Sequence, residues 1–214
     1  MKPVEIFKEV LSVPYLHTSE HQGSYFSKKV DGTLYLYFEK SNGFIDWKNN
    51  FDFPARPYRD MGTKWRAHKG FVKVWKEIEP FLENVIMDKT VTKVIISGYS
   101  HGGAIATLAH EYVWFNRPDL RDSIEGYAFE PPRVFWGWKI PKALKERWNG
   151  FRVYRNGQDI VTHVPPVLFG YHHVGKMIHI NKNRKTIVDR TYIFKCVDEH
   201  NFPNVIAALE QSDN

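Results

Sequence analysis

The chain has 214 residues, of which 43% are hydrophobic, 25% are charged and one is a cysteine. This length and composition support one folded domain over residues 1–214, exclude intrinsic disorder and a disulfide-stapled miniprotein, and argue against a thiolate zinc site. The formal net charge is +6, but the basic residues are scattered along the chain, so we expect no nucleic-acid partner.

The first third of the chain predicts a helix, a hairpin and a long connection. Apolar residues recur at helical spacing up to Pro14, which indicates a short opening helix. Two strand-like runs, 26–30 and 34–38, flank the Asp-Gly pair at 31–32, which tolerates positive φ and favours a tight hairpin turn. Glycine and proline punctuate residues 41–66, so we expect an irregular connection there.

The remainder of the chain predicts alternating helices and strands. Residues 71–85 have the clearest amphipathic pattern, with apolar side chains three and four positions apart. Strand-like runs follow at 91–97, 124–130 and 151–155, and a last helix is expected from about Pro203. This alternation predicts the α/β class, with a mainly parallel sheet covered by helices on its faces.

A nucleophile motif lies between a predicted strand and a predicted helix. Residues 98–102 read Gly-Tyr-Ser-His-Gly, the G-x-S-x-G pattern of a nucleophile elbow. The serine of such an elbow, here Ser100, occupies a strained turn, and Gly98 and Gly102 let the strand and the helix pass closely. Ser100 is therefore the candidate nucleophile.

A serine hydroxyl needs a base, so a carboxylate and a histidine are expected downstream in the order Ser, Asp, His. Asp159 follows the predicted strand 151–155, where a loop can turn to the carboxyl edge of the sheet, although a simple turn role is an alternative. His200 lies on the connection that leads to the last helix. His173 stays an alternative candidate for the general base.

Further stretches stand in order along the chain. They are Asp46-Trp47, His68-Lys69-Gly70-Phe71, Phe129 with Pro131-Pro132-Arg133-Val134, Arg155-Asn156 through Asp159 to Val164-Pro165-Pro166, His173-Val174-Gly175 and His200. Together with the elbow they resemble the fungal-type class 3 lipases, a family with the α/β-hydrolase fold, and the likeness runs from about residue 35 to residue 207. The resemblance implies that Ser100 is the nucleophile, Asp159 the orienting acid and His200 the general base. It also implies that His173 matches a recurring histidine outside the triad.

The resemblance implies an oxyanion hole, with one departure from the family. The family usually has Arg-Gly-Thr or Arg-Gly-Ser after its first long strand, whereas residues 39–41 here read Glu-Lys-Ser. By resemblance Ser41 is one oxyanion donor, beside the backbone N–H of His101. A serine that only begins a turn is the alternative for Ser41.

These residues predict a carboxylic ester hydrolase, and the resemblance implies a triacylglycerol lipase that acts on a lipid or another ester without a cofactor or metal. We also expect transient contact with a lipid surface. A short-chain esterase or a phospholipase of the same fold stays an alternative. Candidates for an acyl pocket follow two predicted strands, although core packing explains them equally well; they are Phe135, Trp136, Leu168 and Phe169.

Two functions of other kinds compete with ester hydrolysis. Residues 17–21 read His-Thr-Ser-Glu-His, the H-x-x-E-H spacing of one group of zinc peptidases. Such a site needs a continuous helix, and Pro14 and Gly23 leave little room for one. The second is a non-catalytic binding module that keeps the hydrolase fold.

The sequence also suggests a cellular location. Acidic residues interrupt what would have to be the apolar core of a signal peptide in residues 1–14. No apolar stretch approaches the ~20 residues that a bilayer span requires. We therefore expect a cytoplasmic rather than a secreted protein.

Overall fold

The computed structural model of the chain describes residues 1–18, 23–40, 55–57, 66–137, 142–181 and 199–212. Within these residues the main sheet has seven strands, which in spatial order are β1 (Leu16–His17), β2 (Ser24–Val30), β3 (Thr33–Phe38), β6 (Lys93–Tyr99), β7 (Ile124–Phe129), β9 (Phe151–Asn156) and β11 (Lys176–Asn181). The first three strands pair antiparallel, and every pairing from β3 to β11 is parallel. The carboxyl ends of five strands therefore lie at one edge.

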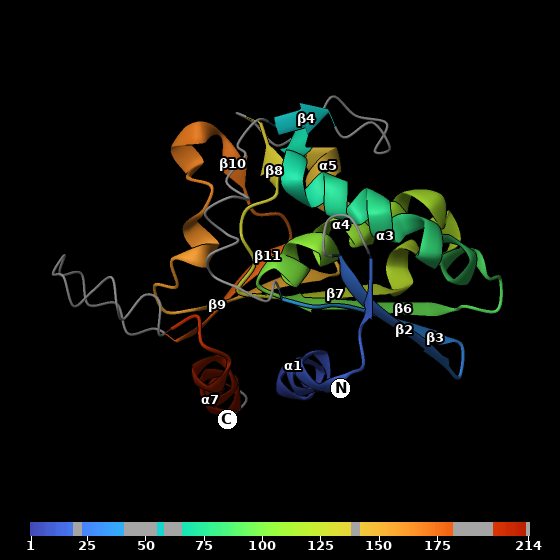
Figure 1. The fold of residues 1–214 in the computed structure, drawn as a ribbon, viewed down its shortest axis with the longest axis horizontal. Helices are drawn as coiled ribbons and strands as arrows, with labels where there is room; N and C mark the ends of the chain where they lie inside the picture. Colours follow the sequence, from blue (N-terminus) through green and yellow to red (C-terminus); the bar gives the residue numbers. More distant parts are fainter. Residues whose placement is uncertain (19–22, 41–54, 58–65, 138–141, 182–198, 213–214) are drawn as a thin grey trace, which may run out of the picture.

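Helices cover both faces of this sheet (Figure 1). The helices α1 (Pro3–Ser12) and α7 (Phe202–Ser212) lie on one face, together with both chain ends. The helices α3 (Lys69–Met87) and α4 (His101–Asn116) lie on the other face, with α4 against β6 and β7 and α3 against α4. The short helical segments are η2 (Pro118–Ser123), α5 (Lys142–Glu146), η3 (Val161–His163) and η4 (Val167–Phe169). The predicted α/β class, with a mainly parallel sheet flanked by helices, is confirmed.

The predicted hairpin is present in β2 and β3. Val30 pairs with Thr33, so the turn consists of Asp31 and Gly32, with φ angles of 47° and 75°. Positive φ at both central residues is what a type I′ turn requires, and its twist matches that of the flanking strands. This pair is why the chain reverses here.

A second sheet lies on the side of the main sheet that α3 and α4 cover, above these helices in Figure 1. In the described part of the chain it has four antiparallel strands in the order β10 (Tyr171–His172), β8 (Phe135–Trp136), β5 (Arg66–His68) and β4 (Ala55–Pro57). The prediction of an irregular connection over residues 41–66 is therefore wrong at β4 and at the start of β5. Strands of two or three residues are too short to produce a period, and an edge strand tolerates Pro57.

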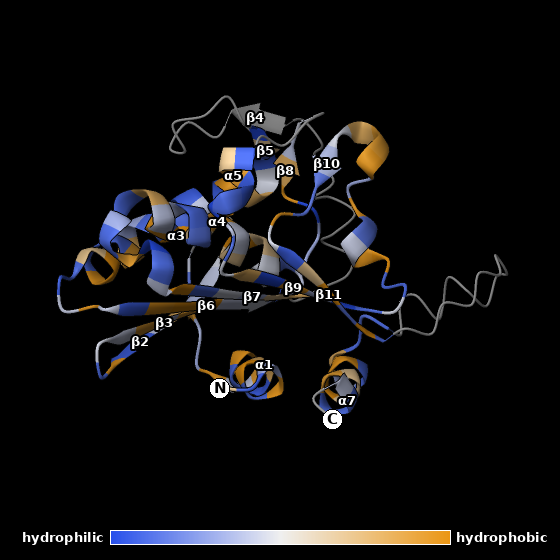
Figure 2. Ribbon diagram, turned by 180° about the vertical axis from the view of Figure 1, so that it is seen from behind, coloured by the Kyte–Doolittle hydropathy of each residue, from blue (hydrophilic) through white to orange (hydrophobic). Residues whose placement is uncertain are grey.

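The core has two layers, one on each side of the sheet. Along β6, Val94 and Ile96 face α3 and α4, whereas Ile95 faces α1. A parallel strand covered on both faces reads as a continuous apolar run, as residues 94–96 do. Figure 2 shows the apolar positions of α1 and α7 in orange beneath the sheet. No helix in the described ranges has the length and hydropathy of a membrane span.

Candidate active site

Ser100 stands at the junction of β6 and α4. Its backbone has φ 56° and ψ −122°, a conformation that residues other than glycine seldom adopt. The Ser100 N–H donates to the Phe129 carbonyl at 2.8 Å, and the Ser100 carbonyl accepts from the Gly103 N–H at 3.0 Å. Neighbouring elements thus hold the strained turn, and such strain is common at functional sites.

The two elbow glycines are required by close backbone contacts. A Cβ on Gly98 would lie 2.2 Å from the Gly102 carbonyl oxygen, and a Cβ on Gly102 would lie 2.1 Å from the Phe38 carbonyl oxygen. No real Cβ makes contacts this short. The absence of side chains therefore lets α4 begin against the ends of β6 and β3.

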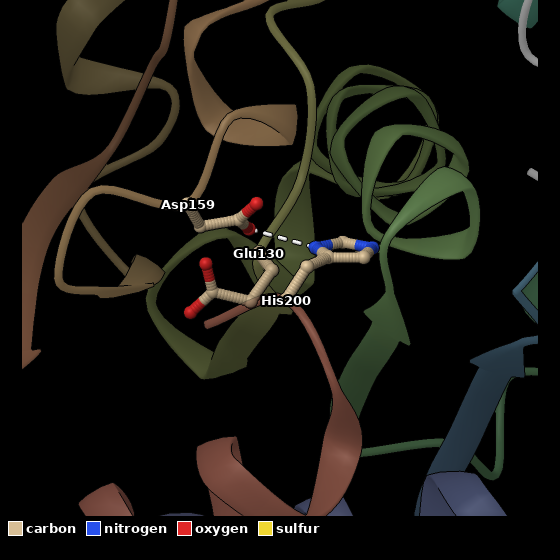
Figure 3. Close-up of side chains that lie close together, drawn as sticks. All are labelled: Glu130, Asp159 and His200. Atoms are coloured by element: carbon tan, nitrogen blue, oxygen red, sulfur yellow. Dashed lines mark hydrogen bonds and ion pairs between the residues drawn. The ribbon is translucent and has the colours of Figure 1, made fainter. Parts of the chain in front are cut away.

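The structure brings Ser100, Asp159 and His200 together. Ser100 Oγ lies 2.9 Å from His200 Nε2, and His200 Nδ1 lies 2.7 Å from Asp159 Oδ2. Asp159 follows β9 and His200 precedes α7, so three distant segments meet at the carboxyl edge; Figure 3 shows Asp159 and His200 pointing toward each other. Asp159 is fully buried, whereas the His200 side chain is 16% exposed. The imidazole thus bridges the hydroxyl and the carboxylate.

The surroundings of Asp159 favour its charged form. Burial acts to raise the pKa of Asp159, but its neighbours Glu130 and His200 outweigh burial and hold it below its ordinary value. The Val161 N–H also donates to Oδ1 of Asp159 at 2.9 Å. An ionised Asp159 can orient the His200 ring and stabilise the imidazolium that forms when the ring takes a proton.

Neighbouring residues hold the two loops that carry Asp159 and His200. The Asn156 side chain donates to the Glu199 carbonyl at 2.8 Å, and the Gln158 N–H donates to the Glu199 carboxylate at 2.6 Å. The Tyr99 hydroxyl donates to the His200 carbonyl, and the Tyr99 ring stacks on the imidazole with centroids 5.2 Å apart. Sequence reasoning missed Tyr99 and Glu199, because nothing local says where their side chains point.

The other histidines of this region have structural partners. His173 Nε2 is bonded to the Thr162 carbonyl at 2.8 Å, and burial lowers the pKa of His173 to about 3, so its ring is neutral. His163 is bonded through Nδ1 to the Asp159 carbonyl at 2.9 Å and through Nε2 to Arg155. His200, not the rival His173, is the histidine that meets Ser100.

One of the two predicted oxyanion donors can be located. His101 is the first residue of α4, and N–H groups of a first helical turn have no acceptor within the helix. Burial, and next the neighbouring His68, lower the pKa of the His101 imidazole to about 4, so this ring is neutral as well. Ser41 lies outside the described residues. The close approach of Phe38 to Gly102 does mean that the chain leaves β3 beside the elbow.

The acyl-pocket candidates occupy different environments. Phe135 is fully buried and packs against Trp148 with ring centroids 4.9 Å apart, so it is a core residue. Trp136 is half-buried under the Arg66 guanidinium, 5.5 Å from the ring centroid. Leu168 and Phe169 are 87% and 61% exposed on η4. These four side chains therefore do not share one environment.

The H-x-x-E-H segment has no helix at its first histidine. His17 belongs to β1, and its Nδ1 is bonded to the Ser24 hydroxyl at 2.8 Å. Residues 20 and 21 lie outside the described residues. Two histidines four apart share a face only on a helix, so a strand at His17 removes the geometry that a zinc peptidase would need.

One described cluster has the spacing of a metal site. The ligand atoms of Glu130, Asp159 and His200 all lie within 4.8 Å of one another. Both ring nitrogens of His200 already have partners in Ser100 and Asp159, so a cation there would displace one of those hydrogen bonds. The arrangement therefore suits proton transfer better than metal binding.

Known proteins resemble this chain in sequence. It is 29% identical over 161 residues to a lipase of Rhizomucor miehei, a match that covers 71% of this chain and 42% of that lipase. It is 30% identical over 132 residues to secreted mono- and diacylglycerol lipase 1 of Fusarium solani, covering 60% of this chain and 38% of the relative. The chain thus spans about two-fifths of the length of these relatives.

One of these relatives corrects the expected location. The Fusarium solani protein is named a secreted lipase, so the expectation of a cytoplasmic rather than a secreted protein is wrong. That expectation rested on the composition of residues 1–14. Most of those residues, Pro3–Ser12, form α1, a helix that packs on the sheet, so its acidic positions are explained by the folded domain and carry no information about targeting.

The family and the fold follow from two further comparisons. The solved triacylglyceride lipase of Rhizomucor miehei superposes with a TM-score of 0.70 at 23% identity, over 88% of this chain and 78% of that chain, which confirms the expected α/β-hydrolase fold. Residues 35–169, more than half of the chain, match the family described as lipase (class 3). This protein therefore belongs to the class 3 lipase family.

Proposed function

We propose that the protein is a carboxylic ester hydrolase of the triacylglycerol lipase type. The observation that carries this proposal is the His200 imidazole, which lies 2.9 Å from the Ser100 hydroxyl and 2.7 Å from the Asp159 carboxylate. In this arrangement Ser100 attacks the ester carbonyl while His200 Nε2 takes the hydroxyl proton. Asp159 keeps the ring in the tautomer that leaves Nε2 free to accept.

The negative charge of the tetrahedral intermediate needs donors on the opposite side of the carbonyl. The N–H of His101 at the start of α4 is one, and the positive end of the helix dipole acts in the same direction. Ser41 is the second donor in this proposal. His200 then gives its proton to the leaving alcohol, and water repeats the cycle to release the acid from Ser100.

An exposed apolar turn supports a lipid substrate. Val167 and Leu168 of η4 are 49% and 87% exposed. They follow Asp159 in the chain, and the segment η4 that contains them is coloured orange, as apolar, just before β10 in Figure 2. Adjacent exposed apolar side chains favour contact with an apolar surface, here the surface of aggregated lipid. The names of the relatives, lipase and mono- and diacylglycerol lipase, point to the same substrate class.

Fluorophosphonate labelling tests the reaction. We expect one covalent adduct on the folded protein, mapped to Ser100 by mass spectrometry, and hydrolysis of p-nitrophenyl esters. Preference for long acyl chains would support a lipase, and loss of activity beyond short chains would indicate an esterase. Absence of an adduct would contradict the proposal and favour a binding module.

Replacing the two apolar side chains, Val167→Ser with Leu168→Ser, tests the lipid contact. Burial of such side chains contributes roughly 1.5–3 kcal/mol each, so we expect at least a tenfold loss of activity on emulsified triacylglycerol. Activity on a soluble short-chain ester should not change. Val30→Ser is the matched control, since Val30 is 48% exposed at the distant hairpin. Equal losses on both substrates, or no loss on the emulsion, would contradict this role for η4.

A further inference from the structure

Glu130 is a buried carboxyl group for which the sequence predicts no role. It follows β7, is fully buried and has a φ angle of 50°, an uncommon value for a residue other than glycine. Its N–H donates to the Tyr154 carbonyl at 2.9 Å, and its Oε1 accepts from the Asn156 N–H at 2.5 Å. Main chain and side chain are therefore both tied to the end of β9.

The carboxyl group of Glu130 lies beside that of Asp159. One oxygen of each carboxyl group and a ring nitrogen of His200 lie within 4.8 Å of one another, and Figure 3 shows the two carboxyl groups near each other. Two buried carboxylates this close cannot both be charged without a large cost. Asp159 has donors in His200 and Val161, so Asp159 is the member that ionises. One proton must then reside on Glu130.

The proton of Glu130 is expected on Oε2, because the other oxygen, Oε1, accepts the Asn156 N–H. Oε2 of Glu130 is buried and has no hydrogen-bond partner in the described part of the chain, and one oxygen of Glu130 lies within 4.8 Å of one of Asp159. A proton on Oε2 would be donated to the Asp159 carboxylate. Such a hydrogen bond removes the repulsion between the two groups and satisfies a buried oxygen that would otherwise have no partner.

Other charged and titratable groups face Glu130 from the surrounding elements. Burial, and next Asp159, raise the pKa of Glu130 well above its ordinary value, while the Asn156 N–H and Arg155 act in the opposite direction. From β6 the Tyr99 hydroxyl faces Glu130, and burial and the two carboxyl groups raise the pKa of Tyr99 as well. His200 faces Glu130 from the turn before α7.

We propose that the orienting acid is a pair, in which protonated Glu130 donates a hydrogen bond to Asp159 and holds it against His200. This inference rests on the proposed hydrolase function. Glu130 touches neither the substrate nor the reacting atoms, so it is a positioning residue. When rising pH removes its proton, two like charges repel, Asp159 moves out of line with His200, and turnover falls on the alkaline side.

The variant Glu130→Gln tests the pair. An amide has nearly the same shape, can donate to Asp159 and accept from Asn156, and does not titrate. We expect turnover close to that of the wild type at neutral pH, without the alkaline decline. Glu130→Leu removes the donor to Asp159, so Asp159 and the His200 ring that it orients would shift. Because small displacements of catalytic groups slow the reaction, we expect kcat to fall about tenfold or more with KM little changed.

Glu125→Gln is the matched control on β7, the strand that Glu130 follows. Glu125 lies near the other end of β7, where its carboxylate pairs with Lys93 at 2.6 Å. The pH profile of this variant should equal that of the wild type. A Glu130→Gln enzyme that keeps the alkaline decline, or a Glu130→Leu enzyme with wild-type kcat, would overturn the inference while leaving the hydrolase function in place.

Unfolding in urea at a series of pH values supplies a readout that needs no activity. Because the pKa of Glu130 is raised from 4.5, the folded state keeps a proton that the unfolded state loses. The free energy of unfolding of the wild type should therefore fall as pH rises from about 4.5 toward the raised pKa. Glu130→Gln should lack this part of the decline. Parallel curves for the two proteins would overturn the inference even if the chain hydrolysed no ester.

Discussion

Ser100→Ala is expected to lower kcat by about 10⁶ while leaving the fold intact. The substitution removes only the hydroxyl oxygen, which lies 2.9 Å from His200 Nε2, and without it no acyl-enzyme can form. Initial rates on a p-nitrophenyl ester measure the loss, and a circular dichroism melt tests the fold. Fluorophosphonate should no longer add to the protein.

Ser97→Ala is the control for the loss at Ser100. Ser97 is also buried on β6, and its hydroxyl donates to the Tyr127 carbonyl at 2.9 Å. Removing that hydroxyl should cost about 1 kcal/mol of stability and leave kcat unchanged. Activity retained in Ser100→Ala, or lost equally in Ser97→Ala, would mean that Ser100 is not the nucleophile.

Gly102→Ala is expected to reduce the free energy of unfolding by about 3 kcal/mol or more. Its Cβ would lie 2.1 Å from the Phe38 carbonyl oxygen and 2.6 Å from the Glu39 carbonyl oxygen. These are backbone atoms of β3 and its continuation, so they cannot move aside as a flexible side chain can. Relief requires α4 to shift away from the sheet, which would also displace Ser100.

Gly137→Ala is the matched control for this clash. A Cβ on Gly137 would meet no atom of the described residues within 4 Å. The same substitution there should change stability by no more than about 0.5 kcal/mol. Urea unfolding of the two variants gives the comparison. Wild-type stability of Gly102→Ala would show that the contact between α4 and β3 is not tightly packed.

The elements that could be predicted are those with a period or a turn signal of their own. The hairpin at 31–32 and the amphipathic helix α3 follow from neighbouring residues, and the structure contains both. The strands of the second sheet were missed because β8 and β10 have two residues each. Phe135, a candidate pocket residue by position after a strand, packs in the core because β8 turns it toward Trp148.

Some residues of the candidate site could likewise be predicted from a local sequence pattern, and others could not. The elbow at 98–102 is a local pattern, since Gly98 and Gly102 are needed for a turn made by adjacent residues. The sequence preferred His200 to His173 as the base, through its place before the last helix and through the resemblance, but His173 stayed an alternative because local pattern does not fix where either ring lies. No sequence pattern pointed to Glu130, because its proposed role depends on contact with Asp159, which follows a different strand.

The sequence by itself determined the α/β class, the hairpin and the strained position of Ser100, because each depends on φ preferences or apolar spacing within a few residues. The sequence favoured His200 as the base, and only the tertiary structure removed the alternative: His200, 41 residues from Asp159, meets it, while His173 bonds to Thr162. The tertiary structure alone placed Glu130 against Asp159. Strand order and helix packing set these distances, and a protonated carboxyl beside a charged one arises only where burial brings both together.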